Sequence, residues 1–286
     1  MKTYYKIVSK NNFFFDTIEQ DTAAEEENPA NVHRQHYHNL FELYLLDSGS
    51  CRYFIDSRVY DVRAGDLVLI PEGVIHRTVY GKGHYRRHLI HLSRHDIPAS
   101  VLPVLSSVGY VYRNPATEGE VRSLFAQMER EWHGEDAYAD ELLREYAHLL
   151  FYLIARNSAE AEPPFSECSY IESAVKYLQT HFDGEVTLSR VASLYSVSRE
   201  HFSRLFKRET GFGFNEYLTL LRLQKAESIL REEPRKNISQ VAYETGFNDS
   251  NYFSDRFHRE YGLSPLKYRR AYRQGETTVH KERSSV

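Results

Sequence analysis

Apolar and polar residues alternate differently in the two halves of the chain. Between residues 41 and 92, short β-type runs are separated by turns such as Asp47-Ser48-Gly49 and Pro71-Glu72-Gly73. The runs cover residues 43–46, 51–55, 67–70 and 88–92. Strands of this length and spacing are typical of a β-sandwich or barrel. Residues 21–31, which are mostly polar and acidic, are expected to form a solvated loop.

The spacing of apolar residues becomes helical after these runs. It predicts one helix at about 118–133 and a second at about 136–157. The second helix carries a wide apolar stripe, made up of Leu142, Leu143, Tyr146, Leu149, Leu150, Leu153 and Ile154. This stripe suits pairing with a second protomer, so we expect a homodimer, although docking of the stripe on the strands explains it equally.

One pattern occurs twice near the C-terminus. The first copy contains Leu188, Ser189, Val191, Ala192, Val197, Ser198, Phe202, Ser203, Phe206, Glu209 and Gly211. The second copy contains Ile238, Ser239, Val241, Ala242, Phe247, Asn248, Phe253, Ser254, Phe257, Glu260 and Gly262. The offset is 50 residues up to Ser198 and Asn248 and 51 residues afterwards, which is a single insertion. A repeated supersecondary unit rarely arises by chance.

Each copy predicts a helix-turn-helix unit. The first helices span about 188–194 and 238–245, and the second helices span about 199–209 and 250–260. Gly246 occupies a turn position that favours left-handed geometry, whereas the first copy has the less permissive Ser196, so its turn is expected to be looser. Two such units on one chain can reach adjacent major grooves of DNA, about 34 Å apart.

The two faces of each second helix differ. One face is apolar, and we expect it to pack inwards through Phe202, Leu205, Phe206, Phe253 and Phe257. The other face is polar and presents the candidate DNA-binding residues, which are Arg199, Glu200, Ser203, Arg204, Lys207, Ser250, Asn251, Ser254, Asp255 and His258. Such side chains on a helix in the major groove reach base edges and phosphates.

The repeat, with the run from Gly246 to Ser254 and the segment Gly262-Leu263-Ser264-Pro265, resembles the AraC/XylS family of bacterial transcription regulators. The resemblance covers about residues 170–272. It implies two three-helix subdomains joined by a long helix at about 214–230, with both recognition helices in successive major grooves. It also implies that RNA polymerase is a partner and that the usual outcome is activation of transcription.

By this resemblance, the base-contacting residues are Glu200, Ser203, Arg204, Asn251, Ser254 and Asp255. Arg204 suits a bidentate contact with guanine, and Asn251 suits one with adenine. Asp255 departs from the family, which often has a basic residue at this position. The acids have an alternative role, because the pairs Glu200/Arg204 and Asp255/Arg259 are spaced for ion pairs within their helices.

The first half of the chain holds two groups of regularly spaced residues, which are His36, His38, Glu42 and Gly49, and then Gly65, Pro71, Gly73 and His76. Their spacing resembles the two motifs of the cupin superfamily, a small double-stranded β-barrel. Side chains alternate along a strand, so an unbroken strand would place both imidazoles of the first group on the same face as Glu42. The sequence departs from the motifs at Ala30 and Tyr80, where a glycine and an asparagine are expected.

Three histidines and one carboxylate suit a divalent transition metal with open coordination positions. The candidate metal ligands are His36, His38, Glu42 and His76. Cupin domains of such regulators often keep the fold without the metal and use the barrel interior for a small effector. The candidate contacts to an effector, such as a sugar or related metabolite, are His36, His38, Glu42, Arg52, Tyr53, His76, Tyr80 and His88. With 22 tyrosines in the chain, packing also explains the two tyrosines.

Charge and composition bear on the partner and the compartment. The net charge is −4, but residues 169–286 carry +4 and the residues before them −8. This asymmetry suits a nucleic-acid module joined to a sensor. Cys51 and Cys168 make no disulfide framework, and we find no apolar run suited to a signal peptide or a membrane span. We therefore expect a cytoplasmic protein without a membrane partner.

The predicted fold class is α+β in several domains. The domains are a cupin-like effector-binding barrel at 1–115, a helical dimerisation segment at 116–157, a linker at 158–168, an AraC-type DNA-binding domain at 169–273 and a disordered tail at 274–286. The predicted function is a sequence-specific transcription regulator, controlled by a small-molecule effector and without catalytic residues. Two alternatives remain open, a metal-dependent cupin enzyme and a metal sensor, each fused to the DNA-binding domain.

Overall fold

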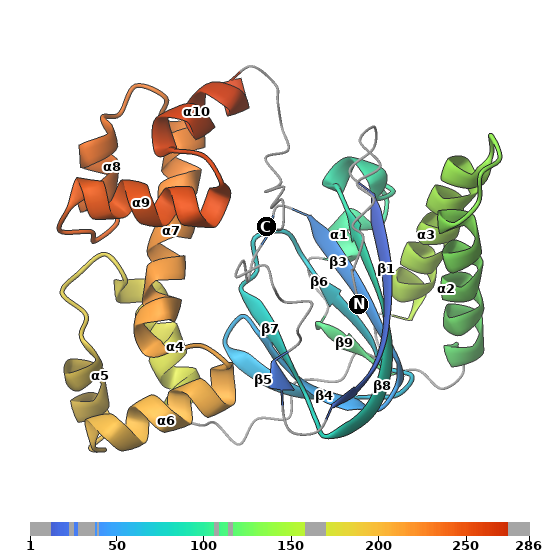
Figure 1. The fold of residues 1–286 in the computed structure, drawn as a ribbon, viewed down its shortest axis with the longest axis horizontal. Coiled ribbons are helices and arrows are strands. Elements are labelled where there is room, and N and C mark those ends of the chain that lie inside the picture. The colour runs from blue at the N-terminus through green and yellow to red at the C-terminus, as the bar shows by residue number, and fades with distance from the viewer. Residues whose placement is uncertain are drawn as a thin grey trace. The chain divides into compact units, whose positions relative to one another are not determined.

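The computed structural model describes residues 13–22, 26–27, 38, 40–105, 109–113, 117–157 and 170–273 of the chain. The chain divides into two compact units, Met1–Ser166 and Glu167–Val286. The elements described in the first unit are mainly strands, and all those described in the second are helices (Figure 1). This division confirms the expected class, a β-rich N-terminal part and a helical C-terminal part.

Two antiparallel sheets form the first unit. The five-stranded sheet has the order β1 (Phe14–Thr22), β8 (Gly83–Leu92), β3 (Phe41–Ser48), β6 (Leu67–Ile70) and β9 (Val111–Tyr112). The four-stranded sheet has the order β2 (Glu26–Glu27), β7 (His76–Tyr80), β4 (Ser50–Ile55) and β5 (Arg58–Arg63). Such a pair of sheets agrees with the sandwich or barrel that the strand spacing predicts.

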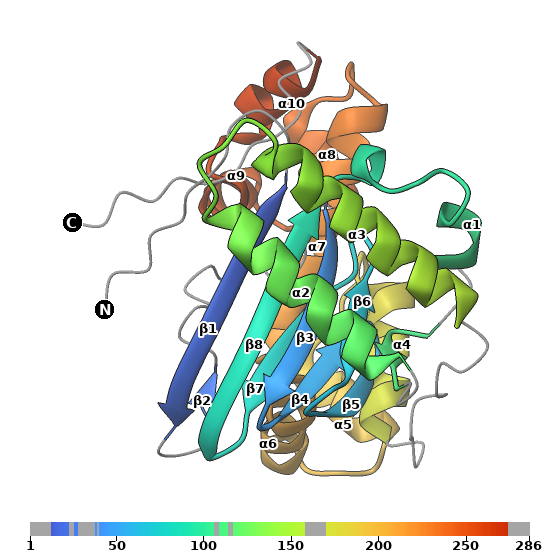
Figure 2. The same ribbon diagram turned by 90° about the vertical axis from the view of Figure 1, so that its right-hand side faces the viewer.

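The two faces of the five-stranded sheet bury different clusters because side chains alternate along each strand. From one face, Tyr44 and Leu46 join Tyr53 and Tyr80 of the other sheet in an inner cluster. From the opposite face, residues such as Leu43 pack against two helices. These helices are α2 (Glu118–Trp132) and α3 (Ala139–Arg156), which lie across the outer face of the sheet (Figure 2).

The apolar stripe of α3 is divided between two surroundings. Leu143, Leu150 and Ile154 are buried against the sheet and α2, so docking on the strands explains this part of the stripe. Leu142 and Leu149 are exposed, with 38% and 51% of their surface accessible.

Two short elements, the 3-10 helix η1 (Arg94–Asp96) and the helix α1 (Leu102–Leu105), precede β9 in the chain.

The strand boundaries differ from the prediction at the N-terminal edge. Residues 21–31 were expected to be a loop, but Asp21 and Thr22 belong to β1, where they pair with His84 and Gly83, and β2 pairs with β7. The prediction was therefore wrong at both positions, because long-range pairing with β7 and β8 overrides the local polar composition. The expected strand over the His-x-His segment is also corrected, since His38 precedes β3 and is not in a strand.

The second unit has helices close to the predicted boundaries. They are α4 (Tyr170–His181), α5 (Leu188–Leu194), α6 (Arg199–Thr210), α7 (Phe214–Glu232), α8 (Ile238–Glu244), α9 (Ser250–Tyr261) and α10 (Pro265–Arg273). The long helix α7 contacts α6, α8 and α10 and thus links the two repeats (Figure 1). No helix in the described part of the chain combines the length and apolar character needed to cross a membrane.

Local sequence explains where these helices begin and end. The side chains of Thr187, Ser198, Asn237 and Asp249 each accept a hydrogen bond from a backbone N–H in the first turn of α5, α6, α8 and α9. These caps satisfy donors that a helix N-terminus leaves unpaired. The helices α6 and α9 both end at a left-handed glycine, Gly211 or Gly262.

Candidate functional site

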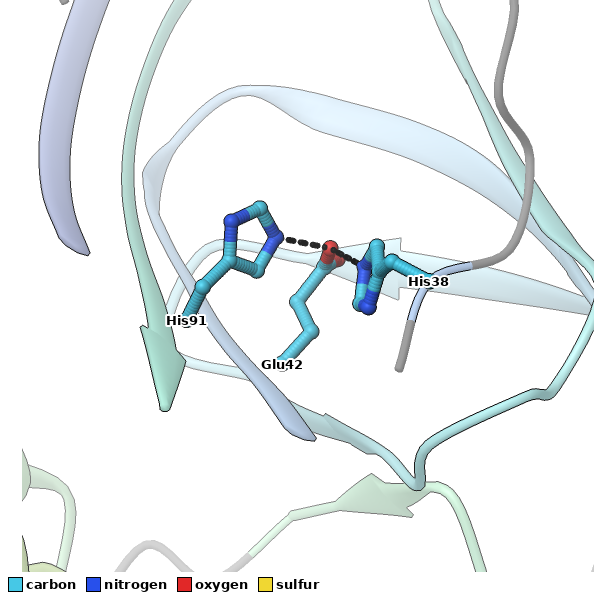
Figure 3. A group of neighbouring side chains, drawn as sticks. All are labelled: His38, Glu42 and His91. Atoms are coloured by element: carbon cyan, nitrogen blue, oxygen red, sulfur yellow. Dashed lines mark hydrogen bonds and ion pairs between the residues drawn. The ribbon is translucent and has the colours of Figure 1, made fainter. Parts of the chain in front are cut away.

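The first candidate site surrounds the carboxylate of Glu42 in β3. The Oε2 atom of Glu42 lies 3.2 Å from Nε2 of His38, 2.9 Å from Nε2 of His91 and 3.5 Å from Nε2 of His76. Figure 3 shows the carboxylate between the imidazoles of His38 and His91. The other oxygen, Oε1, accepts a hydrogen bond of 2.5 Å from the hydroxyl of Tyr53. One carboxylate thus contacts four side chains from separate parts of the barrel.

Burial and mutual attraction set the charges of this cluster. Burial alone raises the pKa of Glu42, but the attraction of His76 and the polar contacts with the three histidines outweigh it and hold the pKa well below its usual range. Burial lowers the pKa of His76, yet the neighbouring Glu42 reverses the effect and raises it above its usual value. Burial and the proximity of His38 lower the pKa of His91 to about 4. The carboxylate is therefore ionised although it is buried.

The structure brings only part of the predicted effector set together. His38, Glu42, Tyr53 and His76 form the cluster, and Tyr80 lies in the adjoining inner cluster, where it accepts a hydrogen bond from Tyr44. His36 lies outside the described residues.

The structure places two further predicted contacts away from this cluster. Arg52 lies between Cys51 and Tyr53, which both point into the inner cluster, so its side chain belongs to the opposite face of β4. His88 packs against Phe15 and Phe125, on the helix-covered face of the five-stranded sheet. Neither side chain faces the barrel interior with Glu42.

Two interior residues were missed in the sequence. His91 is directly opposite Glu42 in the register of β3 and β8, which brings its ring to the carboxylate. Arg87 lies two residues before Leu89 on β8 and therefore faces the same side, and its side chain is 3% exposed. Its guanidinium pairs with Asp16 at 2.9 Å, whereas its Nη1 has no partner among the described residues. No local motif marks either residue. The only signal is their spacing from Tyr85, since residues separated by an even number of positions along a strand face the same side.

A pocket elsewhere in the unit is too small for an organic effector. It has a volume of about 30 Å³ and lies between the sheet and the helices, where its lining includes Leu67, Tyr112, Val121 and Ile154. This is the space of about one water molecule. The residues around Glu42 are not among those that line this pocket.

The second candidate site consists of the polar faces of α6 and α9. The exposed candidates on α6 are Arg199, Glu200, Arg204 and Lys207, and Ser203 is half-buried. The exposed candidates on α9 are Asn251, Asp255 and His258, and Ser250 and Ser254 are half-buried. The opposite faces are anchored by fully buried aromatic residues, which are Phe202, Phe206, Phe253 and Phe257. Both helices are therefore fixed by their apolar faces and present their polar faces to solvent.

Some polar residues of this surface already have partners. Asp255 forms an ion pair of 3.1 Å with Arg259, as the spacing within α9 predicts. The corresponding pair in α6 is not formed, since no ion pair joins Glu200 and Arg204 in the described part of the chain. Ser254 donates a hydrogen bond to the backbone carbonyl of Ser250, so part of its polar capacity is used within the helix. Arg259 is therefore held by an acidic neighbour in its own helix, whereas Arg204 has no such ion pair with Glu200.

Sequence comparison matches two family models along the chain. The model of an AraC-like ligand-binding domain matches residues 22–147, and the model of a helix-turn-helix domain matches residues 191–271. The chain belongs to the AraC/XylS family. The matched segments fall on the two-sheet unit with its helices and on the unit that contains both repeats.

This family member is similar over most of its length to curated relatives. It is 27% identical over 264 residues to the HTH-type transcriptional activator RhaS of Shigella boydii serotype 18, covering 90% of this chain and 94% of that protein. It is 28% identical, with the same coverage, to the protein of that name from Escherichia coli O81. Among solved structures, the C-terminal domain of AraT from Geobacillus stearothermophilus is 33% identical, covers 42% of this chain and 95% of that chain, and has a TM-score of 0.36.

Proposed function

We propose that this chain is a transcription regulator that binds a specific double-stranded DNA site and responds to a small-molecule effector in its N-terminal barrel. The observation that carries the proposal is the pair of equivalent helices, α6 and α9, each buried on an aromatic face and exposed on a polar face. The named activators that match 90% of the chain support the same function. Because these relatives are regulators, catalysis is no part of the proposal.

The proposed DNA interface uses α6 and α9 as recognition helices in successive major grooves. Arg204 is assigned to guanine and Asn251 to adenine, because their side chains offer the matching pairs of hydrogen-bonding groups. Glu200, Ser203, Ser254 and Asp255 flank these two positions on the same faces. The remaining candidates, which are Arg199, Lys207, Ser250 and His258, are assigned to phosphates, where charge and hydroxyl groups position the protein without reading sequence.

The proposed effector site is the barrel interior around Glu42. A buried carboxylate, the histidines and the unpartnered Nη1 of Arg87 offer both acceptors and donors to a small polar molecule. A sugar or related metabolite, rich in hydroxyl groups, fits this combination. The effector can change DNA binding only if it favours one state of the protein over the other.

A homodimer is proposed through the exposed face of α3. Tyr138, Leu142, Leu149 and Tyr152 are all exposed and lie on one side of the helix, with the exposed Glu145 between Leu142 and Leu149. Exposed large apolar side chains gathered on one helix face are typical of a protein contact. A dimer would bring four helix-turn-helix units to one promoter, where activation requires contact with RNA polymerase. The proposed place of action is the cytoplasm, where the DNA is.

The experiment that tests the function is selection of fragmented genomic DNA from the source organism on the purified full chain. The proposal predicts that one or a few intergenic fragments are enriched, and that a promoter reporter built from them responds to the protein. A chain that is folded and retains no fragment above background, with and without metabolite extract, would contradict it. A variant with both Arg204 and Asn251 replaced by alanine serves as the matched control for non-specific retention.

A further inference from the structure

Arg222, in the middle of α7, holds a segment that lies forty residues before it in the chain. Its Nε atom donates a hydrogen bond of 2.7 Å to the carbonyl oxygen of Phe182, and its Nη2 atom donates one of 3.0 Å to that of Gly184. Both carbonyls lie in the connection between α4 and α5, which belongs to the first repeat's side of the unit. Because a guanidinium donates along fixed directions, the two bonds hold residues 182–184 in one position against α7.

The same guanidinium also contacts the second repeat. Its Cζ atom lies 5.9 Å from the centre of the Phe247 ring, in the turn between α8 and α9. A guanidinium and an aromatic face attract each other at this distance. Gly246, the residue before, approaches just as closely, since a Cβ there would lie 2.8 Å from Nε of Arg222 and 2.8 Å from the carbonyl oxygen of Phe182. Arg222 therefore joins the α4–α5 connection to the turn of the second repeat.

This junction explains why glycine is present in only one of the two turns. Ser196 and Gly246 both have a left-handed backbone, so the turn itself accepts a residue with a side chain. At Gly246, however, the space of a Cβ is already taken by the guanidinium of Arg222 and by the carbonyl oxygens of Phe182 and Asp183. Close packing between the two halves of the unit, in addition to the turn geometry, therefore requires glycine here.

The junction bears on DNA binding because it restrains the two recognition helices relative to each other. The helix α7 contacts α6 on one side and α8 and α10 on the other. A single connecting helix leaves each half free to tilt about its own packing contact. A second contact, away from the axis of α7, opposes such a tilt. Successive major grooves lie at a fixed spacing of about 34 Å, so the restraint acts on the quantity that DNA binding depends on.

We propose that Arg222 is a positioning residue that fixes the separation of α6 and α9 and thereby determines which spacing of two DNA segments the chain accepts. This inference rests on the proposed DNA binding by both helices. Arg222 is half-buried and acts through Phe182, Gly184 and Phe247 rather than by touching DNA. A rigid pair of helices gains most at the matched spacing, where binding of the first helix presents the second at high effective concentration.

The first test compares a retained genomic site with the same site carrying one additional base pair between its two protected segments. The insertion moves one segment by about 3.4 Å and rotates it by about 35°. We expect the unaltered chain to bind the inserted site at least about tenfold more weakly, and Arg222→Met to reduce this ratio to about threefold or less. Lys225→Met removes an exposed cation from the same helix and should leave the ratio unchanged, because loss of a phosphate contact weakens both sites alike.

The second test measures the separation of the helices without DNA. The full chain, with its two native cysteines replaced by alanine, carries spin labels at Arg208→Cys on α6 and Arg259→Cys on α9, which are exposed positions at equivalent places in the repeats. Double electron–electron resonance should give one narrow distance distribution for this chain and for its Lys225→Met variant. Arg222→Met is expected to broaden or shift the distribution, since the restraint on the two halves is lost.

Two results would overturn the proposal. One is a folded Arg222→Met variant with the distance distribution of the unaltered chain. The other is an Arg222→Met variant that discriminates between the two DNA sites as the unaltered chain does. Gly246→Ala disturbs the same junction from the other side and provides a second variant should Arg222→Met not fold, and an unchanged distribution and ratio in it would overturn the proposal equally. Absence of specific DNA binding by the unaltered chain would contradict the proposed function, whereas the distance measurement decides the role of Arg222 without DNA.

Discussion

Ser196 and Gly246 adopt the same left-handed backbone conformation at equivalent positions of the two repeats, with φ of 55° and 84°. The surrounding hydrogen bonds are also equivalent. Val197 N–H donates to the carbonyl of Ala192 at 3.2 Å, and Phe247 N–H donates to that of Ala242 at 2.9 Å. The serine in the first repeat predicts a looser turn, but the first turn has the same left-handed geometry as the second. Ser196 therefore carries the energetic cost of a left-handed backbone.

Exchanging these residue types is expected to shift stability in opposite directions. Left-handed geometry costs an L-residue about 1–2 kcal/mol, so Ser196→Gly should stabilise the folded state by up to about 1 kcal/mol after the entropy of glycine in the unfolded chain is counted. Gly246→Ala should destabilise by more than about 1 kcal/mol, because its Cβ would also lie 2.8 Å from the carbonyl oxygen of Phe182. Urea unfolding followed by circular dichroism measures both. Equal effects of the same sign would contradict the interpretation.

The α3 face predicts which substitution breaks the proposed dimer. Leu149→Glu replaces an exposed leucine of this face with a charged residue next to Glu145, and it is expected to give a monomer at micromolar concentrations, measured by sedimentation equilibrium. Leu266→Glu changes a leucine of similar exposure on α10 and is expected to leave the dimer intact. A folded Leu149→Glu variant that sediments as the unaltered dimer would place the interface elsewhere.

His88 predicts part of the pH dependence of stability. Burial lowers its pKa to about 4, against about 6.5 in an unfolded chain. The unfolded state therefore binds an additional proton between these values, so the contribution of His88 is complete above about pH 6.5 and is lost as the pH falls towards 4. His88→Gln is expected to flatten this part of the profile of unfolding midpoint against pH. His133→Gln, at an exposed position, should leave it unchanged, and an unaltered slope in His88→Gln would count against the buried neutral ring.

Arg204 is expected to determine one base of the DNA site. Arg204→Ala should cost about 1–3 kcal/mol of binding free energy on the specific site and relax the preference at one position. Fluorescence anisotropy on the site and on its single-base variants measures both effects. Arg130→Ala removes the same charge from the exposed surface of α2 and should change neither. An equal loss on random DNA would identify Arg204 as a phosphate contact.

The helices of the second unit could be predicted closely because their determinants are local. Thr187, Ser198, Asn237 and Asp249 cap the helices that follow them, and the apolar faces repeat with helical spacing. The repeat also placed the polar faces of α6 and α9 correctly at the surface. Packing of this unit mainly joins elements that are close in sequence.

The polar cluster could be predicted only in part, because strand pairing decides it. Glu42, His38 and His76 are marked by motif spacing, but His91 is brought to Glu42 by the register of two strands distant in sequence. The sequence-based prediction names His88, which is three residues from His91 along β8 and therefore points to the opposite face of the sheet. The same alternation turns Arg52 away while Tyr53 points inwards. Side-chain direction in a barrel follows register, which a single sequence does not determine.

The most direct test of the proposed regulator is a hydroxyl-radical footprint of the full chain on a genomic fragment that it retains. Two recognition helices on one chain predict two protected backbone segments whose centres are about 10–10.5 base pairs apart on one face of the DNA. Arg204→Ala should weaken one segment and Asn251→Ala the other. Protection of a single segment, or the loss of both segments in each variant alike, would contradict binding by two separate helices.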